Sequence, residues 1–550
     1  MKRDTSKLSK KTFDLLIIGG GIYGASIAWD AASRGLSIAL VDKGDFGGAT
    51  SSNSQKIIHG GLRYIQQGDL RRVRESARER RILMHIAPQL VHPMPCLIPI
   101  YGSFMQSVMP LALKIYNLTS FDKNTFEDPQ KHILGGRTVS KEECLRLIPG
   151  IKEEGLRGGA IWYDGQVYNT ERMVLSFIKS ANNAGADVAN YIEVIDFLKD
   201  GNCIKGAKAR DLLNGTEIEI RAKLVLNVAG PWVNQILSRV KNSPDQKILL
   251  SKMMLLVVNR IFAHDYAFGI PSLKKSSDMD NVACKKSRLL FVTPWRNNSL
   301  IGTAQEPYNG DPNSLKIKEK DIFGFIEEFN KAYPQAALKR KEVTFFYAGL
   351  VPMDGISHDG DVRVTSQYKI FDHEKDGIKG LVSIVGVKYT TARDVAQKAT
   401  DLVFKKLGKK PPKCTTMETR LCGGSIERFN EFLENAIKTR PQELSKQTML
   451  HLVYNYGSEY PEVLKYLGED WSNEISASLH VIKAEILYGI KEEMAQKLAD
   501  VILRRTELGT AGYPGDECLK TCASIMAKKL GWNESKIHSE IEEVKAIYTP

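Results

Sequence analysis

The chain has 550 residues, a formal net charge of +13 and 43% hydrophobic residues. Its length suggests about three to four domain-sized units. With 26% charged residues and a mean hydropathy of -0.25, the composition excludes a disordered, collagen-like or low-complexity protein, and the positive charge favours an anionic ligand or surface.

The N-terminal region predicts neither a signal peptide nor a spanning helix. Basic residues 1–11 lead directly into an apolar strand pattern, without a small-residue cleavage site before the glycines. The first long apolar run, residues 15–41, contains Asp30 and Arg34, which do not suit a spanning helix. We therefore expect a cytoplasmic protein.

The chain opens with the pattern of a strand, a glycine turn, a helix and a second strand. The turn contains Gly19, Gly21 and Gly24, and Asp42 ends the second strand. These glycines permit a tight turn, a close approach to a pyrophosphate, and packing of the helix on the strand. Asp42 is placed to accept hydrogen bonds from a ribose. The pattern predicts a dinucleotide-binding unit.

Further strand-forming runs follow at residues 223–228, 289–293, 343–347 and 380–385. We expect the first and last of these to complete the nucleotide-binding sheet, and the other two to belong to a second sheet that forms the substrate half. Pro411 and Pro412 break any helix and predict a linker. Beyond the linker, apolar residues recur with helical spacing, which predicts a helical C-terminal domain.

The eight cysteines are scattered, which favours free thiols over a disulfide framework. Cys518 and Cys522 are spaced to share one helix face. Without a second pair, this spacing indicates core packing, and we predict no metal site.

One segment is more specific than the glycine turn. Residues 47–64 read GGATSSNSQKIIHGGLRY, with small and hydroxyl side chains that permit close approach to a flat ring system. With residues 227–232 (NVAGPW) and 386–393 (GVKYTTAR), this segment closely resembles the FAD-dependent glycerol-3-phosphate dehydrogenases. The resemblance covers nearly the whole chain and includes FVTPW at 291–295, IGT at 301–303, YAG at 347–349 and RRTELG at 504–509.

The patterns and the resemblance together predict an α/β fold. It comprises a Rossmann-like FAD-binding domain, an inserted mixed-sheet substrate domain and an all-helical C-terminal domain. The expected boundaries are 1–100, 155–235 and 345–406 for the discontinuous FAD-binding domain, 101–154 and 236–344 for the substrate domain, 407–425 for the linker, and 426–550 for the C-terminal domain.

The resemblance implies oxidation of glycerol 3-phosphate to dihydroxyacetone phosphate, by hydride transfer to flavin N5, with electrons passing to quinone. The implied FAD-binding residues come from the glycine turn, the hydroxyl segment and the two later motifs. They are Gly19, Gly21, Gly24, Asp42, Thr50, Ser51, Ser52, Ser54, His59, Gly60, Gly61, Ala229, Gly230, Trp232, Gly386, Lys388 and Thr390.

The implied catalytic residues are His59, Arg63 and Lys388, and the implied substrate-binding residues are Arg63, Tyr64, Lys388 and Arg363. The alternative role for Arg63 is a surface ion pair without contact to substrate. His59 is either a flavin-facing general base or an ordinary packed histidine, and the sequence leaves both open.

Three positions depart from the family pattern. Val351 and Ser366 stand where phosphate-pairing arginines are usual, and Leu255 stands nearest to a usual histidine. Arg363 is close enough in sequence to replace one arginine. The departures keep a second substrate class open, another polyol phosphate or a hydroxy acid, oxidised by a dehydrogenase or an oxidase.

Two segments are candidates for contact with an anionic membrane on its cytoplasmic face. Residues 104–116 are apolar and residues 71–81 are strongly basic, although a buried helix and a solvated helix face explain them equally well. Oxygen is an alternative acceptor to quinone, and a homodimer is possible. An RNA-associated flavoprotein lacks any recognised RNA-binding motif, so no nucleic acid is expected, and a redox-inactive flavin-binding scaffold is the remaining alternative.

Overall fold

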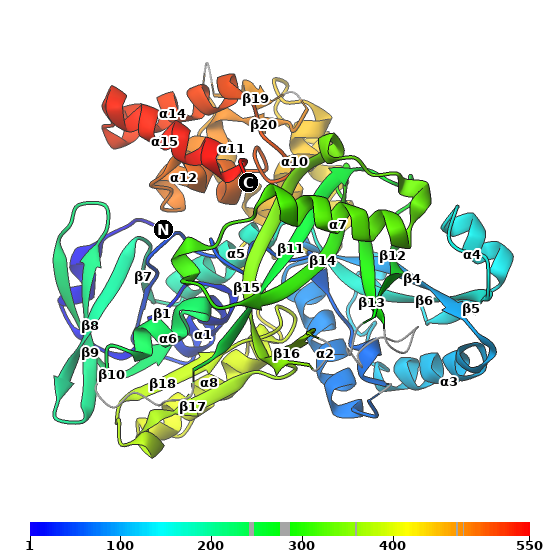
Figure 1. Ribbon diagram of the computed structural model, residues 1–550. Helices are drawn as coiled ribbons and strands as arrows, with labels where there is room; N and C mark the ends of the chain where they lie inside the picture. The colour runs from blue at the N-terminus through cyan, green and yellow to red at the C-terminus, as the bar shows by residue number, and fades with distance from the viewer. Residues whose placement is uncertain (66, 241–246, 276–286, 358–359, 469–470, 477) are drawn as a thin grey trace.

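The computed structural model describes residues 1–65, 67–240, 247–275, 287–357, 360–468, 471–476 and 478–550 (Figure 1). Two large sheets form the body of the protein, and a mostly helical C-terminal region packs against both. Arg505 of that region binds Asp45 beside the first sheet, and Tyr347 of the second sheet donates a hydrogen bond to the Thr510 carbonyl.

The first sheet is the predicted nucleotide-binding sheet. Among the described residues it has eight strands, in the order β17-β18-β10-β1-β2-β7, with β8 and β9 attached beside β10. The strands are β1 (Thr12–Ile18), β2 (Ile38–Val41), β7 (Asp187–Ala189), β8 (Ile192–Asp200), β9 (Cys203–Asp211), β10 (Glu217–Asn227), β17 (Lys369–Asp372) and β18 (Leu381–Val385). The central strands β1, β2, β10 and β18 run parallel, so their carboxyl ends meet at one edge.

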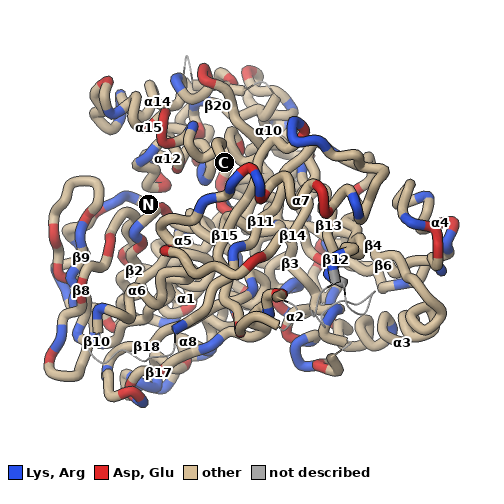
Figure 2. The backbone as a smooth tube through the Cα atoms, in the orientation of Figure 1, with Lys and Arg blue, Asp and Glu red and all other residues tan. Residues whose placement is uncertain are grey.

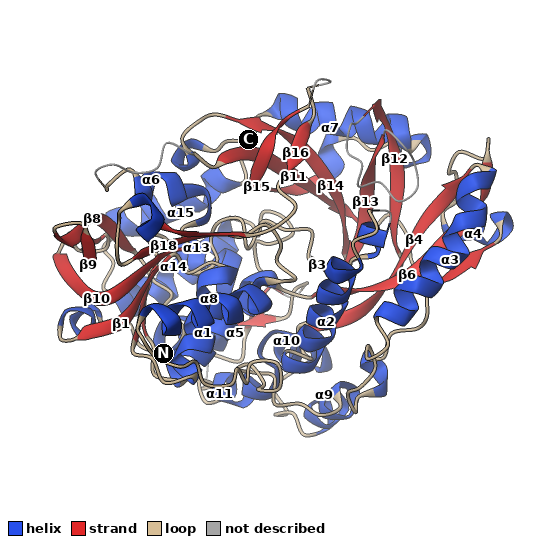
Figure 3. Ribbon diagram, turned by 90° about the horizontal axis from the view of Figure 1, so that it is seen from below, coloured by secondary structure: helices blue, strands red, loops and turns tan. Residues whose placement is uncertain are grey.

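The central strands of this sheet are apolar on both faces, so helices cover one face and residues of β8 and β9 pack on the other. Figure 3 shows α1 (Ile22–Ser33), α5 (Thr170–Asn183) and α8 (Ala392–Lys406) grouped together, and their buried side chains share one core with β1 and β2. The predicted order of strand, glycine turn, helix and strand is confirmed over β1, α1 and β2. The strands predicted at 223–228 and 380–385 are β10 and β18.

The second sheet has ten strands among the described residues, in the order β16-β15-β11-β14-β13-β12-β4-β6-β3, with β5 beside β6. They are β3 (Ile57–Ile58), β4 (Val91–Tyr101), β5 (Arg137–Val139), β6 (Leu156–Val167), β11 (Leu249–Asn259), β12 (Ala267–Lys275), β13 (Ser287–Trp295), β14 (Asn298–Tyr308), β15 (Val343–Ile356) and β16 (Val362–Val364). Helix α7 (Glu319–Ala332) packs Ile322, Phe325 and Phe329 against it.

This sheet does not follow the domain boundaries expected from the sequence. Strands β4, β6 and most of β15 fall in segments assigned to the FAD-binding domain, yet they are hydrogen-bonded within the second sheet. Pairing partners are chosen by tertiary packing, so a boundary drawn through sequence segments separates strands that the sheet joins.

The remaining helices of the body are α2 (Leu70–Ile86), α3 (Ser103–Thr119), α4 (Lys141–Leu147) and α6 (Val233–Leu237). In the described part of the chain, no helix combines the length and apolar character needed to cross a membrane.

The C-terminal region is mainly helical, as predicted. Its elements are α9 (Phe429–Lys438), α10 (Lys446–Tyr456), α11 (Tyr460–Leu464), α12 (Lys483–Glu492), α13 (Leu498–Asp500), the π-helical turn η10 (Val501–Arg505), α14 (Asp516–Leu530) and α15 (Glu534–Ile547). A short hairpin of β19 (Glu474–Ser476) and β20 (Val481–Ile482) corrects the expectation of an all-helical domain. Cys518 and Cys522 are buried in α14, and the described residues contain no cluster suited to a metal ion.

Candidate active site

The glycine turn between β1 and α1 has no room for side chains at its key positions. Gly19 has a φ of +112°, and a Cβ on Gly24 would lie 1.8 Å from the Gly19 carbonyl oxygen. Helix α1 can therefore begin directly against the end of β1, with Gly21 as its N-cap. The first N–H groups of α1 then face the turn, which is the arrangement that binds a pyrophosphate.

Two predicted side chains hold this turn. Asp42 follows β2 and accepts a 2.6 Å hydrogen bond from the Gly20 N–H, while Ser51 Oγ accepts a 3.0 Å bond from the Ile22 N–H. Burial raises the pKa of Asp42. Asp42 and Ser51 thus lie together at the N-terminus of α1, although they are 9 positions apart in the sequence.

The other predicted hydroxyl residues hold their own loop in place. Thr50 Oγ1 donates a 2.9 Å hydrogen bond to the Leu350 carbonyl of β15, and Ser52 Oγ donates to the Gly47 carbonyl. Ser54 Oγ accepts from the Lys56 N–H at 3.4 Å. The loop thereby bridges the glycine turn and the second sheet, so the site is built between the two sheets.

The later predicted residues follow the carboxyl ends of β10 and β18. Ala229 and Gly230 come directly after β10, and a Cβ on Gly386 would lie 2.1 Å from the Tyr23 ring of α1. Trp232 donates its indole N–H to Asn313 at 2.8 Å. These segments, the glycine turn, the N-terminus of α1 and the hydroxyl-rich loop together form a binding region that we call the cradle. Its glycine backbone and the first N–H groups of α1 fit a dinucleotide.

Beside the cradle, His59 forms a pair with Asp164 of β6. His59 Nδ1 lies 3.0 Å from Asp164 Oδ2, and the Gly60 N–H donates a 2.7 Å hydrogen bond to Asp164 Oδ1. The His59 side chain is 56% exposed, whereas that of Asp164 is 3% exposed. Burial opposes ionisation of Asp164, but hydrogen bonds from His59 and Gly60 and the charge of Arg80 lower its pKa. An ionised Asp164 requires a proton on Nδ1, which leaves a lone pair on Nε2.

A buried arginine contacts Asp164 of this pair. The Arg80 guanidinium, on α2, donates a 2.6 Å hydrogen bond to the Tyr116 hydroxyl and lies 3.4 Å from Asp164 Oδ1. A Cβ on Gly60 would lie 2.1 Å from Arg80 Nη1, so the chain approaches the guanidinium as closely as only glycine allows. Gly61 has a φ of +88° and turns the chain toward Tyr64.

Three cations surround the buried ring of Tyr64. Arg63 donates a 2.8 Å hydrogen bond to the Tyr64 hydroxyl, Lys388 Nζ lies 3.9 Å from the ring centre, and Arg72 lies 4.7 Å from it. Burial opposes ionisation of Tyr64, but the charges of Arg63 and Lys388 outweigh it and lower its pKa. Burial also lowers the pKa of Lys388. This concentration of positive charge is suited to an anionic ligand.

The cradle and this cation cluster are directly joined. Tyr23 of α1 donates a 2.7 Å hydrogen bond to the Lys388 carbonyl, and the His59 N–H donates to Thr390 Oγ1 at 3.2 Å. The segment after β18 therefore contacts both the glycine-turn helix and the histidine segment. The structure places His59, Arg63, Tyr64, Lys388 and Thr390 in one region.

Comparison with known proteins identifies the dinucleotide that the protein binds. Residues 14–387 match the family model described as FAD dependent oxidoreductase, and residues 414–537 match that of the C-terminal domain of alpha-glycerophosphate oxidase. A glycerol-3-phosphate dehydrogenase from Synechocystis is 30% identical over 98% of this chain and 97% of its own length. The chain belongs to the FAD-dependent glycerol-3-phosphate dehydrogenase family.

Two further relatives agree. An aerobic glycerol-3-phosphate dehydrogenase from Staphylococcus haemolyticus is 29% identical over 91% of this chain and 87% of its own length. The glycerol-3-phosphate dehydrogenase structure from Bacillus halodurans, complexed with FAD, matches with a TM-score of 0.77 and 27% identity, covering 99% of this chain and 96% of the other. The protein is thus an FAD-dependent oxidoreductase acting on CH–OH groups, and the prediction of FAD is confirmed.

The residues that depart from the family pattern contribute no positive charge. Val351 lies half-buried in β15 opposite Ser251, and Ser366 follows β16. Leu255 is buried in β11, where its side chain packs near Gly302 of β14.

Two other basic residues near these positions have separate surroundings. Lys252 binds Asp321 at 2.9 Å and Glu306 at 2.5 Å, so two carboxylates neutralise it. Arg363 is exposed on β16, opposite Gly355 of β15. Its predicted contact with substrate stays a prediction.

Sequence reasoning missed Asp164, Arg80 and Tyr116. Asp164 lies in an ordinary strand pattern 105 residues after His59, and Arg80 lies in a basic stretch that resembles a solvated helix face. The one available signal was Gly60-Gly61, because a glycine pair after a histidine indicates close approach by another group. It did not say which group approaches.

Proposed function

We propose that this protein oxidises the secondary alcohol of glycerol 3-phosphate to dihydroxyacetone phosphate and passes the electrons to quinone. The observation that carries the proposal is the His59–Asp164 pair beside the cations around Tyr64, because a base and an anion site are what a hydroxy phosphate ester requires. The relatives named glycerol-3-phosphate dehydrogenase support it.

In this proposal the glycine turn, Asp42 and Ser51 hold FAD at the N-terminus of α1. When bound, FAD supplies the acceptor for the hydride that leaves the alcohol carbon. His59 Nε2 takes the hydroxyl proton as the C=O bond forms. Asp164 keeps the Nδ1 proton in place and stabilises the imidazolium that results.

Arg63 and Lys388 bind the phosphate group in this scheme. Both lie against Tyr64, and burial of Lys388 strengthens its attraction for an anion because nearby water screens it less. The phosphate then fixes the position of the alcohol carbon relative to His59, which is how remote binding lowers a reaction barrier.

The test is anaerobic reduction of the bound flavin. We expect glycerol 3-phosphate to bleach the oxidised flavin absorbance at sub-millimolar concentration, and oxidised quinone to restore it. Glycerol without phosphate is the control, and it should bleach the flavin far more slowly. A holoprotein that is bleached by another alcohol but not by glycerol 3-phosphate would contradict the proposal.

Such a result would favour the second candidate, another polyol phosphate or a hydroxy acid. Val351 and Ser366 bring no charge to the substrate side, and Lys252 is already neutralised by two carboxylates. A substrate with a singly charged group needs fewer cations than a phosphate ester does. Oxygen replaces quinone as acceptor if reduced flavin reoxidises rapidly in air.

We also propose that α3 rests on an anionic membrane surface. Phe104, Leu111 and Leu118 are 69%, 60% and 75% exposed, and their spacing of 7 residues places them on one helix face. The other face packs against the segment containing Tyr64. Figure 2 shows α3 with little charge, beside the basic residues of α2. This surface would bring the site close to a membrane-dissolved quinone.

Sedimentation with vesicles of anionic phospholipid tests this contact. The double variant Leu111→Ser and Leu118→Ser should reduce the vesicle-bound fraction, while Phe323→Ser, which removes a 54% exposed ring from α7, should not. Equal binding of both variants would refute the α3 surface. A homodimer stays a prediction, and sizing of the purified protein tests it separately.

A further inference from the structure

The C-terminal region contacts the loop after β2 through one buried carboxylate. Asp45 accepts hydrogen bonds from Arg505 Nη1 at 2.6 Å and Nη2 at 2.8 Å, from Arg504 Nε at 2.6 Å, and from Asn190 at 2.9 Å. Its side chain is 0% exposed. Burial opposes ionisation, but the charges of Arg505 and Arg504 outweigh it and lower the pKa of Asp45. The carboxylate therefore stays charged and paired.

This carboxylate lies within the loop that covers the glycine turn. Asp42, three positions earlier, accepts from the Gly20 N–H, and the Gly47 N–H, two positions later, donates a 3.0 Å hydrogen bond to the Gly20 carbonyl. The Phe46 ring, between Asp45 and Gly47, lies against Gly20. Fixing Asp45 therefore fixes the residues on both sides that hold the turn.

We propose that the C-terminal domain retains FAD by clamping this loop, with Arg505 and Asp45 as positioning residues. The domain lies outside the predicted FAD-binding segments, so its role is to keep the loop closed over the glycine turn. Without Arg505, Asp45 keeps only Arg504 as its contact in the C-terminal domain, and the loop opens more often. Each opening frees the turn and lets FAD leave.

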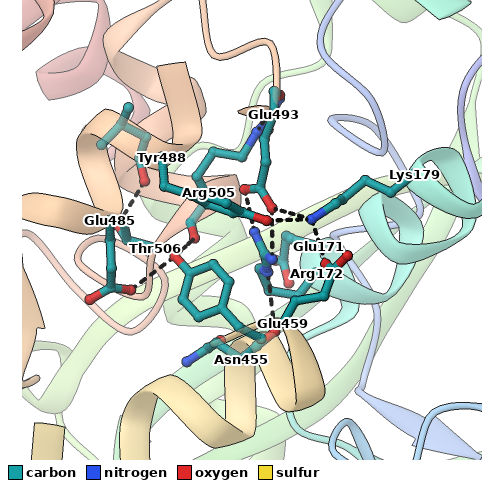
Figure 4. Close-up of polar contacts among 12 residues, drawn as sticks. Glu171, Arg172, Lys179, Asn455, Glu459, Glu485, Tyr488, Glu493, Arg505 and Thr506 are labelled. Carbon is teal, nitrogen blue, oxygen red and sulfur yellow. Dashed lines mark hydrogen bonds and ion pairs between the residues drawn. The ribbon is translucent and has the colours of Figure 1, made fainter. Parts of the chain in front are cut away.

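A second ion pair provides a matched comparison. Arg172 of α5 donates to Glu493 through Nη1 at 2.5 Å and Nη2 at 2.9 Å (Figure 4), and it too is buried between the body and the C-terminal region. Each arginine also donates to a backbone carbonyl, and each carboxylate has a second cation, Arg504 for Asp45 and Lys179 for Glu493. Of these two ion pairs, only Arg505–Asp45 includes a residue of the loop after β2 that holds the glycine turn.

The experiment compares Arg505→Met with Arg172→Met in the full-length holoprotein. FAD release is followed by the rise of flavin fluorescence after dilution, and urea unfolding of each variant measures its overall stability. We expect FAD to leave about tenfold faster or more from Arg505→Met, because the buried Asp45 loses two charged hydrogen bonds and keeps only Arg504 as a cation. Arg172→Met should lose comparable stability with release changed by less than about twofold.

Two further variants keep the test decisive if Arg505→Met does not fold. Arg505→Lys retains the charge but only part of the hydrogen bonding, and Asp45→Asn retains the shape without the charge. Both should release FAD faster than the wild type. Equal rates of FAD release from the Arg505 and Arg172 variants would overturn the proposal. So would FAD release rates that simply track the free energy of unfolding of each variant. Loss of dehydrogenase activity with unchanged FAD release would also overturn it, while leaving the proposed function open to its own test.

Discussion

The proposed cofactor side of the site and its proposed substrate side are built on different principles. The cofactor side relies on the absence of side chains, since a Cβ on Gly24 would meet the Gly19 carbonyl at 1.8 Å. The substrate side relies on charges gathered from distant segments, with Arg63 and Lys388 both against Tyr64. Backbone geometry tolerates little change, whereas a set of charges can be redistributed. We infer that the cradle is the constant half of the site and the cation cluster the adjustable half.

Filling the cradle should have the largest effect. Gly24→Val forces α1 away from β1, and overpacking of this kind costs about 1–3 kcal/mol or more. We expect purified protein without flavin, measured as the ratio of flavin to protein absorbance. The control is Gly324→Ala in α7, where a Cβ meets open space and full FAD content should persist. A yellow Gly24→Val protein would show that the cradle is less constrained than the comparison implies.

The next largest effect should come from Asp164→Asn. Asp164 accepts a hydrogen bond from His59 on one oxygen and from Gly60 and Arg80 on the other. An amide has only one oxygen, so either the Gly60 N–H loses its acceptor or the amide N–H faces His59 Nδ1. In the second case Nδ1 must accept a hydrogen bond from the amide, which places the ring proton on Nε2. We expect flavin reduction, followed by stopped-flow absorbance, to slow by about 10²-fold or more with FAD still bound. Unchanged reduction at all pH values would exclude His59 as the base.

Adding charge to the substrate side tests how adjustable it is. Val351→Arg introduces a cation in β15, and a charged hydrogen bond to phosphate contributes about 1.5–3 kcal/mol. We expect the Kd of glycerol 3-phosphate, from its perturbation of the flavin spectrum, to fall by about tenfold. Val351→Met adds length without charge and should not lower it. A Kd that rises in both variants would mean that Val351 limits space and that the existing cations suffice.

The smallest expected effect is a change in pH dependence. Burial lowers the pKa of Lys388, and neighbouring cations lower that of Tyr64 despite its burial. As pH rises, Lys388 loses its positive charge and Tyr64 gains a negative one, each below its ordinary range, so anion affinity should weaken by several-fold. Titration of the Kd of inorganic phosphate measures this. In Lys388→Met the binding should be weaker at neutral pH and should fall less steeply as the pH rises.

The sequence was informative wherever function depends on neighbouring residues. The spacing of Gly19, Gly21 and Gly24 predicted β1, the turn and α1, because a local turn imposes its own chemistry on a few consecutive positions. The segment from Thr50 to Tyr64 identified the family for the same reason. The two predicted strands at β10 and β18 were also found, since apolar runs before glycine are a local signal.

The sequence by itself determined the family, the cofactor and the cradle, because these depend on short motifs whose residues act together within one turn. Tertiary structure alone decided that Asp164 binds His59, that Lys252 is neutralised, and that Arg505 binds Asp45, 460 positions away. Each of these contacts joins segments whose local patterns are ordinary. These residues become partners only when the fold brings them together away from water, because burying an unpaired charge costs free energy of folding.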